Sequence, residues 1–267
     1  MRVCLLTDKP GHPLLAATVS LLAGAGHSVT FHDPDAGTGS GAAAGEGLAD
    51  VYLLKAHTPR AIALARDLEA RGARVVNSAD ATHLCQDRSR MADLALSAGL
   101  PMPRTRTLDA LSEAGARGAT GIGFPCMVKS RHNRRGDLVA RVDDEAGLRA
   151  LASAWPDEPV VIQEFMENSG WDHKLWVIGK EVFTGLRPAP EEAGTAAALS
   201  APLVREVPGE WAALALRMGE IFRLEVYGID LLDRRGEPVV VDVNAFPGIR
   251  GPLGAPAALA ALVTPAG

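Results

Sequence analysis

The sequence predicts a parallel α/β domain at the N-terminal end of the chain, followed by two α+β lobes. The first 83 residues alternate short apolar runs with helical stretches, which is typical of a parallel sheet built from βαβ units. Beyond residue 84, apolar runs follow one another across short polar turns, as antiparallel strands do. The last two runs, 225–233 and 238–244, are separated only by Arg-Arg-Gly-Glu and predict a hairpin.

Each element rests on apolar periodicity and on residues that end helices. The first helix is closed by Gly26, and the third by Gly99 with Pro101 beyond it. The expected helices are 13–25, 59–71, 87–98, 143–154 and 209–223. The expected strands are 2–7, 28–33, 50–55, 73–77, 124–130, 138–142, 159–166, 173–179, 181–187, 225–233 and 238–244. The Gly- and Ala-rich tract 37–47 is expected to be a mobile loop. Domain boundaries are placed at 1–83, 84–160 and 161–267.

Composition and charge argue against several classes of protein. The 267 residues carry a formal charge of −5, whereas nucleic-acid-binding proteins normally show a basic excess. No apolar run reaches the roughly 18 residues of a membrane span, and Asp8 and Lys9 come too early for a signal peptide. The three cysteines are scattered, as is typical of reduced thiols. We therefore expect a cytoplasmic protein with no membrane or nucleic-acid partner.

Two acids and an amide lie within the last predicted hairpin. Asp230 interrupts one apolar strand, and Asp242 and Asn244 lie two residues apart in the next. Side chains two residues apart point to the same side of a strand, so pairing of the strands would bring all three together. Oxygen ligands of this kind suit Mg²⁺. The alternative is a set of polar residues on the solvent-facing side of an antiparallel sheet.

The stretch Asp-Val-Asn-Ala-Phe-Pro-Gly, with Gly-Ile-Asp-Leu-Leu about a dozen residues earlier, resembles the signature of the ATP-grasp superfamily. The resemblance is strongest to the branch of ribosomal-protein glutamate ligases, carrier-protein ligases and inositol trisphosphate kinases. It implies an ATP-grasp fold in which two α+β lobes clasp ATP. It also implies that Asp230, Asp242 and Asn244 hold Mg²⁺, with Mn²⁺ as an alternative.

Further motifs resemble the family's ATP site in the same order along the chain. They lie in the stretches 86–105, 124–130, 160–166 and 170–179. In the family, these segments contact the ATP phosphates, adenine and ribose. The resemblance implies that the nucleotide contacts Arg88, Lys129, Gln163, Glu164, Phe165, Met166 and Asp172. Arg88 departs from the more usual lysine. The segment 130–137 takes the place of a glycine-rich lid but contains one glycine and three arginines, which leaves closure of a lid open.

Three basic residues are expected to act in catalysis. By resemblance, Lys174 lies near a phosphate or the second substrate, and Arg187 reaches the transferred phosphoryl group. Arg250, where relatives often have an acid, is expected to hold a substrate anion. Lys55 and His57 resemble a substrate contact of the kinases. All five residues are expected to converge on one cleft and to select a small anionic substrate.

The family includes several reactions, and the sequence favours one of them. We expect a carboxylate–amine ligase that forms an amide through an acyl phosphate, with a small anionic substrate and an amine co-substrate as its partners. The alternatives are a kinase acting on an inositol phosphate or other small polyol, and a nucleotide-binding module without turnover. A homodimer is left open.

Overall fold

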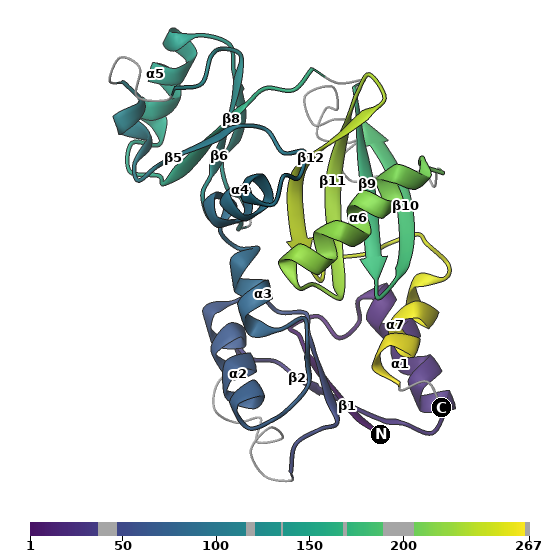
Figure 1. Cartoon of the computed structure of the whole chain (residues 1–267). Helices are drawn as coiled ribbons and strands as arrows, with labels where there is room; N and C mark the ends of the chain where they lie inside the picture. Colours follow the sequence, from purple (N-terminus) through teal and green to yellow (C-terminus); the bar gives the residue numbers. More distant parts are fainter. Residues whose placement is uncertain (37–46, 116–120, 135, 168–169, 189–205, 265–267) are drawn as a thin grey trace.

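The computed structural model describes residues 1–36, 47–115, 121–134, 136–167, 170–188 and 206–264. It contains three four-stranded sheets. Figure 1 shows one sheet at the N-terminal end and two more that face each other across the upper half of the molecule. Most of the tract 37–47, expected to be a mobile loop, lies outside the described residues. The predicted mixed α/β and α+β architecture is confirmed.

The N-terminal sheet is parallel, with the strand order β2-β1-β3-β4. Its strands are β1 (Arg2–Leu6), β2 (Ser28–His32), β3 (Val51–Leu54) and β4 (Val75–Val76). The helices of this region are α1 (Pro13–Gly24), α2 (Pro59–Ala70) and α3 (Ala79–Leu84). Strands β1 and β3 bury side chains on both faces: one face contributes to the core that contains α1, the other to the core that contains α2. This double burial explains their unbroken apolar sequences.

The central sheet is antiparallel, with the strand order β5-β8-β6-β7. Its strands are β5 (Thr105–Leu108), β6 (Cys126–Ser130), β7 (Val139–Val142) and β8 (Val160–Glu164). The helix α5 (Glu145–Ala154) and the 3₁₀ helix η1 (Leu111–Gly115) cover one face. The helix α4 (Arg88–Ser97) connects this part of the chain to the N-terminal domain. The other face of the sheet is left to line a cavity.

The third sheet is antiparallel, with the strand order β10-β9-β11-β12. Its strands are β9 (Trp171–Ile178), β10 (Glu181–Pro188), β11 (Val226–Arg234) and β12 (Glu237–Ala245). The helix α6 (Gly209–Phe222) packs on one face. The register shifts after Asp230, so that Asp242 pairs with Asp230 while Val240 pairs with Leu231. Val241 is therefore the extra residue of a β-bulge.

The C-terminal helix α7 (Ala255–Val263) returns to the N-terminal domain and packs beside α1 (Figure 1). The buried residue Asn77, just after β4, also joins the two parts: its Nδ2 donates to the Val226 carbonyl (2.6 Å), and its Oδ1 accepts from the Glu225 and Val226 amides (2.8 and 2.9 Å). The predicted domain boundaries stay predictions. Among the described residues, no helix combines the length and apolar character that crossing a bilayer requires.

Candidate nucleotide and substrate site

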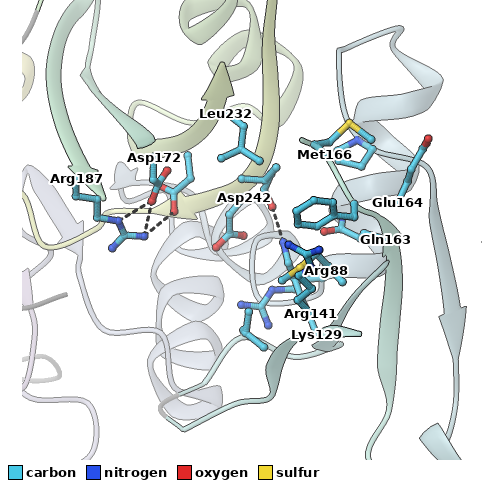
Figure 2. A pocket seen from close by; sticks show the side chains of 16 residues that line it. Arg88, Lys129, Arg141, Gln163, Glu164, Met166, Asp172, Arg187, Leu232 and Asp242 are labelled. Carbon is cyan, nitrogen blue, oxygen red and sulfur yellow. Dashed lines mark hydrogen bonds and ion pairs between the residues drawn. The ribbon is translucent and has the colours of Figure 1, made fainter. Parts of the chain in front are cut away.

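A cavity of about 500 Å³ lies between the exposed face of the central sheet and the polar face of the third sheet. Its size is that of a typical small-molecule pocket. Figure 2 shows side chains entering it from both sheets. The lining residues are Arg88, Pro103, Met127, Lys129, Val139, Arg141, Gln163, Glu164, Phe165, Met166, Asp172, Arg187, Asp230, Leu232, Val241 and Asp242.

Strand register explains how the central sheet builds its wall of this cavity. Met127 is the direct cross-strand partner of both Arg141 and Gln163, and paired residues share a face. Lys129 lies two residues beyond Met127 on the same face. The guanidinium group of Arg141 lies over the ring of Phe165, 4.4 Å from its centroid. This wall therefore combines the stacked Arg141 and Phe165 side chains with Met127 and the ammonium group of Lys129.

Arg88, which is buried, and Lys129, which is partly buried, supply two positive charges. Lys129 Nζ donates to the carbonyl of Val241 (3.2 Å), the bulged residue of β12. Burial lowers the pKa of Lys129, and the nearby Asp242 carboxylate partly opposes this effect. Arg88 Nη1 donates to Asp137 Oδ2 (2.6 Å) and to the Ser130 carbonyl (2.8 Å). Arg88 is therefore held rigidly at the edge of the cavity.

Acids and bases alternate across the polar face of the third sheet. Arg187 donates to Asp172 through Nε (2.6 Å), and its Nη2 lies 3.8 Å from Asp230 Oδ2. Lys174 forms ion pairs with Asp230 and Asp172. Burial, together with the neighbouring Asp230 carboxylate, raises the pKa of Asp172 to about 6. Figure 2 shows Arg187 joined to Asp172 at the cavity, and Asp230 also lines it.

Residues of the same polar face also fit a hard cation. Asp230 and Asp242 are cross-strand partners, and Asn244 follows on the same side of β12. Asn244 Nδ2 donates to Asp242 Oδ2 (3.3 Å), while its Oδ1 accepts from Asn133 Nδ2 (3.1 Å). Within the described residues, no three His, Cys, Asp or Glu side chains form a metal site. The set here combines two carboxylates with one amide oxygen, which suits Mg²⁺.

A second cavity, of about 600 Å³, has Asn244 in its lining and shares no lining residue with the first. It lies at the carboxyl ends of β1 and β3, where ligands commonly bind parallel sheets. Its lining residues are Thr7, Asp8, Lys9, His12, Lys55, Ala56, His57, Thr58, Pro59, Gln86, Asn133, Arg134 and Asn244. Lysine and arginine outnumber the single acid in this set, so the cavity favours an anion.

Burial adjusts the charges of this second cavity. Desolvation, helped by the charge of Lys9, lowers the pKa of Lys55 to about 8. Desolvation and the charge of Lys55 lower the pKa of His57 to about 4. At neutral pH, Lys55 is therefore mostly charged and His57 is neutral. Burial and the charges of Lys55 and Arg250, among others, also lower the pKa of His12.

The structure separates the basic residues that were expected to share one cleft. Arg187 lines the first cavity, and Lys174 is paired with two of its acids. Lys55 and His57 line the second cavity. Arg250 is exposed and lies near His12, outside both sets of lining residues. The five residues therefore do not line a single cavity, and their action on one substrate stays a prediction.

Each of the other predicted site residues lines one of the two cavities. All seven expected nucleotide contacts line the first cavity, and so do Asp230 and Asp242. Asn244 lines the second cavity. Sequence reasoning missed Arg141, Leu232 and Asn133. The two-residue spacing of Leu232 from Asp230 was a usable signal, because it places both on one face, whereas no predicted site residue lies two positions from Arg141. The Asn133–Asn244 contact had no such signal.

The facing sheets, the cavity between them and the polar β11–β12 hairpin define an ATP-grasp protein. The fold superimposes on the crystal structure of a RimK domain ATP-grasp protein from Sphaerobacter thermophilus with a TM-score of 0.77, covering 98% of both chains at 26% identity. A D-alanine–D-alanine ligase from Bacillus anthracis, solved with ATP, gives a TM-score of 0.70 at 16% identity, covering 93% of this chain and 87% of the ligase. Residues 85–254 match the RimK-like ATP-grasp domain model, and the chain belongs to this family.

Two curated relatives are named probable α-L-glutamate ligases. The protein from Hydrogenovibrio crunogenus is 29% identical over 196 residues, and that from Vibrio vulnificus is 27% identical over 203 residues. Each alignment covers 71% of this chain. The chain spans only 65% of the length of either relative.

Proposed function

We propose that this protein is an ATP- and Mg²⁺-dependent carboxylate–amine ligase that acts on a small anionic substrate through an acyl phosphate. The observation that carries the proposal is that two cavities lie on either side of the Asp242–Asn244 hydrogen bond. The first cavity is lined by apolar side chains such as Met127, Phe165 and Leu232 together with charged ones that include Lys129 and Arg88, and the second is lined by polar and basic residues. A nucleotide bound in the first cavity would direct its phosphates toward a carboxylic acid substrate bound in the second cavity.

The first cavity suits adenosine triphosphate. Adenine would lie against Met127, Phe165 and Leu232, and backbone groups after β8 would form hydrogen bonds with its polar edge. Lys129 and Arg88 would contact the phosphates, since both cations line the same cavity. Asp172 would lie near the ribose.

The cation would be held by Asp230, Asp242 and Asn244. It would neutralise the phosphate charge during phosphoryl transfer. Mn²⁺ is the alternative to Mg²⁺. Arg187, held by Asp172, would stabilise the phosphoryl group in transit, and Lys174 would remain beside Asp230. Lys55, His57 and Arg250 would bind or steer the acid from the other side. The facing sheets would exclude water from the reacting groups.

The proposed reaction has two steps. A carboxylate oxygen of the acid bonds to the γ-phosphorus while the bond to the ADP oxygen breaks. The nitrogen of a neutral amine then bonds to the carbonyl carbon, the phosphate leaves with its oxygen, and the nitrogen loses a proton. The names of the glutamate ligase relatives support an amino acid as one of the two substrates.

A kinase is the second candidate, because the basic second cavity would also hold a phosphorylated polyol. Product analysis separates the possibilities. Purified protein is incubated with ATP, Mg²⁺ and pools of amino acids, small acids and inositol phosphates, and the products are identified by mass spectrometry. Free phosphate with a new amide supports the ligase, and a phosphorylated polyol supports the kinase. Nucleotide binding without turnover on any pool supports a binding module.

Asp242→Asn tests the cation site. Because Asp242 faces the cavity rather than the core, we expect turnover to be abolished while the thermal unfolding midpoint changes little. Asp233→Asn is the control, since Asp233 lies near the turn of the same hairpin, outside the first cavity. Full activity of Asp242→Asn at saturating Mg²⁺ would remove Asp242 from the site.

A further inference from the structure

We propose that Asn133 is a positioning residue that restrains the amide of Asn244 and lowers the cation affinity of the site until their contact is released. The inference rests on the proposed role of Asn244 as a cation ligand. It concerns a side chain in the segment that takes the place of the family's glycine-rich lid. It also implies that ligands in the two cavities affect each other's binding through this contact.

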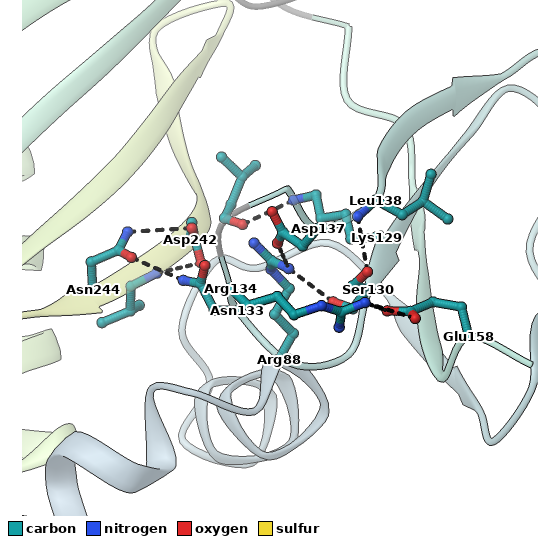
Figure 3. A network of polar contacts seen from close by, with 12 residues as sticks. Arg88, Lys129, Ser130, Asn133, Arg134, Asp137, Leu138, Glu158, Asp242 and Asn244 are labelled. Atoms are coloured by element: carbon teal, nitrogen blue, oxygen red, sulfur yellow. Dashed lines mark hydrogen bonds and ion pairs between the residues drawn. The ribbon is translucent and has the colours of Figure 1, made fainter. Parts of the chain in front are cut away.

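The hydrogen bonds of Asn244 use both ends of its amide group. Its Nδ2 donates to Asp242 Oδ2 (3.3 Å), and its Oδ1 accepts from Asn133 Nδ2 (3.1 Å). Figure 3 shows the three side chains in a chain of contacts that runs from the hairpin to the 130–138 segment. The oxygen that would bind a cation is thus the one that faces a donor hydrogen. The positive end of that N–H dipole and a cation compete for the same electron density.

The donor, Asn133, lies in a segment that is held in place by hydrogen bonds to neighbouring elements. The backbone N–H of Asn133 donates to the Gln86 carbonyl (3.0 Å). Two residues earlier, Arg131 Nη2 binds Asp87 Oδ2 (2.9 Å), and its backbone N–H donates to the Pro159 carbonyl (2.7 Å). Because these bonds tie the segment to α4 and to the start of β8, Asn133 does not follow Asn244 freely when the amide turns toward a cation. As long as the contact holds, Asn133 draws electron density from the oxygen that a cation would use.

The position of this contact links the two cavities. Asn133 and Asn244 both line the second cavity, whereas Asp242 lines the first. A carboxylate in the second cavity would accept the hydrogen bond of Asn133 and free the oxygen of Asn244. The acid and the cation would then favour each other's binding, since such coupling is reciprocal.

The test measures cation affinity directly, without turnover. Mn²⁺ binding in the presence of ADP is followed by electron paramagnetic resonance for the wild type and for Asn133→Ala. A neutral hydrogen bond contributes modestly, so we expect Asn133→Ala to bind Mn²⁺ about two- to tenfold more tightly. His132→Ala is the matched control because its side chain is exposed in the same segment, and its Kd should equal that of the wild type.

A double-mutant cycle with Asn244→Ala isolates the contact. In the Asn244→Ala background, Asn133→Ala should leave the Kd unchanged, and thermal melts verify that each variant is folded. A residue with a merely structural role would weaken Mn²⁺ binding when lost. Equal or weaker binding by Asn133→Ala, with normal binding by the wild type, overturns this inference alone. Absence of ADP-dependent Mn²⁺ binding by the wild type overturns both the inference and the proposed function.

Discussion

At the scale of single residues, Lys129 is expected to contribute to ATP binding but not to the stability of the fold. Its ammonium group is buried between the two sheets and donates to the Val241 carbonyl, while burial lowers its pKa. A buried charge of this kind is costly for folding, and the carboxylates of Asp242, Asp230 and Asp172 offset only part of that cost, since the pKa stays lowered. Lys129 lines the first cavity, where a bound anion would offset the remainder.

Lys129→Ala should reduce ATP affinity while leaving stability unchanged or raised. A lost charge-assisted phosphate contact costs roughly 1.5–3 kcal/mol of binding free energy. Isothermal titration calorimetry with ATP or a non-hydrolysable analogue measures this loss, and urea unfolding measures stability. The exposed Lys180 provides the control Lys180→Ala, which should change neither quantity. Unaltered nucleotide affinity in Lys129→Ala would exclude it from the site.

At the scale of elements, the start of α4 and the 130–138 segment are held together by Asp87. Its carboxylate caps α4 by accepting from the Ser89 amide (3.0 Å) and also binds Arg131 through three contacts of 2.9–3.1 Å. Burial alone raises the pKa of Asp87, but the hydrogen bonds from Arg131 and Ser89 outweigh it and lower the pKa to about 2. The carboxylate is therefore a stabilising group only while ionised.

Asp87→Ala should lower the free energy of unfolding by about 2–4 kcal/mol at pH 7, through loss of the helix cap and of a partly buried ion pair. The unfolded chain takes up the Asp87 proton at a higher pH than the folded chain, so the wild-type advantage is complete above about pH 5 and fades toward pH 2. Urea unfolding of both proteins at pH 7 and pH 3 measures the difference.

The control for this prediction is Asp109→Ala. Asp109 lies 3.8 Å from the same arginine, but its side chain is 89% exposed. Exposed ion pairs contribute little, so this variant should match the wild type at both pH values. If Asp87→Ala loses as much stability at pH 3 as at pH 7, the ion pair is not the source of the effect.

At the scale of the whole molecule, the N-terminal domain is joined to the third sheet by buried groups. Asn77 binds the start of β11 through three hydrogen bonds, and α7 packs on α1 within a core shared with Trp176 and Val226. All four tryptophans lie beyond residue 84. Tryptophan fluorescence therefore reports the C-terminal parts, while far-ultraviolet circular dichroism reports the whole chain. We expect their unfolding transitions to coincide in the wild type.

Asn77→Ala should lower the free energy of unfolding by about 2–4 kcal/mol, because two amides and a carbonyl lose their buried partner. Arg74→Ala is the control: Arg74 joins the same two parts through an ion pair with Glu225 (3.0 Å) that is about half exposed, and its loss should cost under about 1 kcal/mol. A small effect of Asn77→Ala, equal to that of Arg74→Ala, would show that this clamp does not hold the two parts together.

Local periodicity was enough to predict most strands and helices of this protein, and with them the convergence of Asp230, Asp242 and Asn244. The direct Asp230–Asp242 pairing was not predictable in this way, because the register set by the turn pairs Leu231 with Val240 and only the β-bulge at Val241 brings Asp242 opposite Asp230. Four elements were not predicted: β5, α3 and η1 are short and of mixed polar composition, and α7 is uniformly apolar. Its alanine-rich sequence carries no polar face from which its packing partner is predictable.

The sequence by itself determined the order of elements, the family and the set of residues that carry charge at the site. Only the tertiary structure decided which of them meet. It divided the basic residues between two cavities, exposed the Val241 carbonyl to Lys129 through a bulge, and brought Asn133 against Asn244. The physical reason is distance along the chain. Faces of one strand follow from backbone geometry, whereas contacts between segments more than 100 residues apart depend on how whole sheets and helices pack.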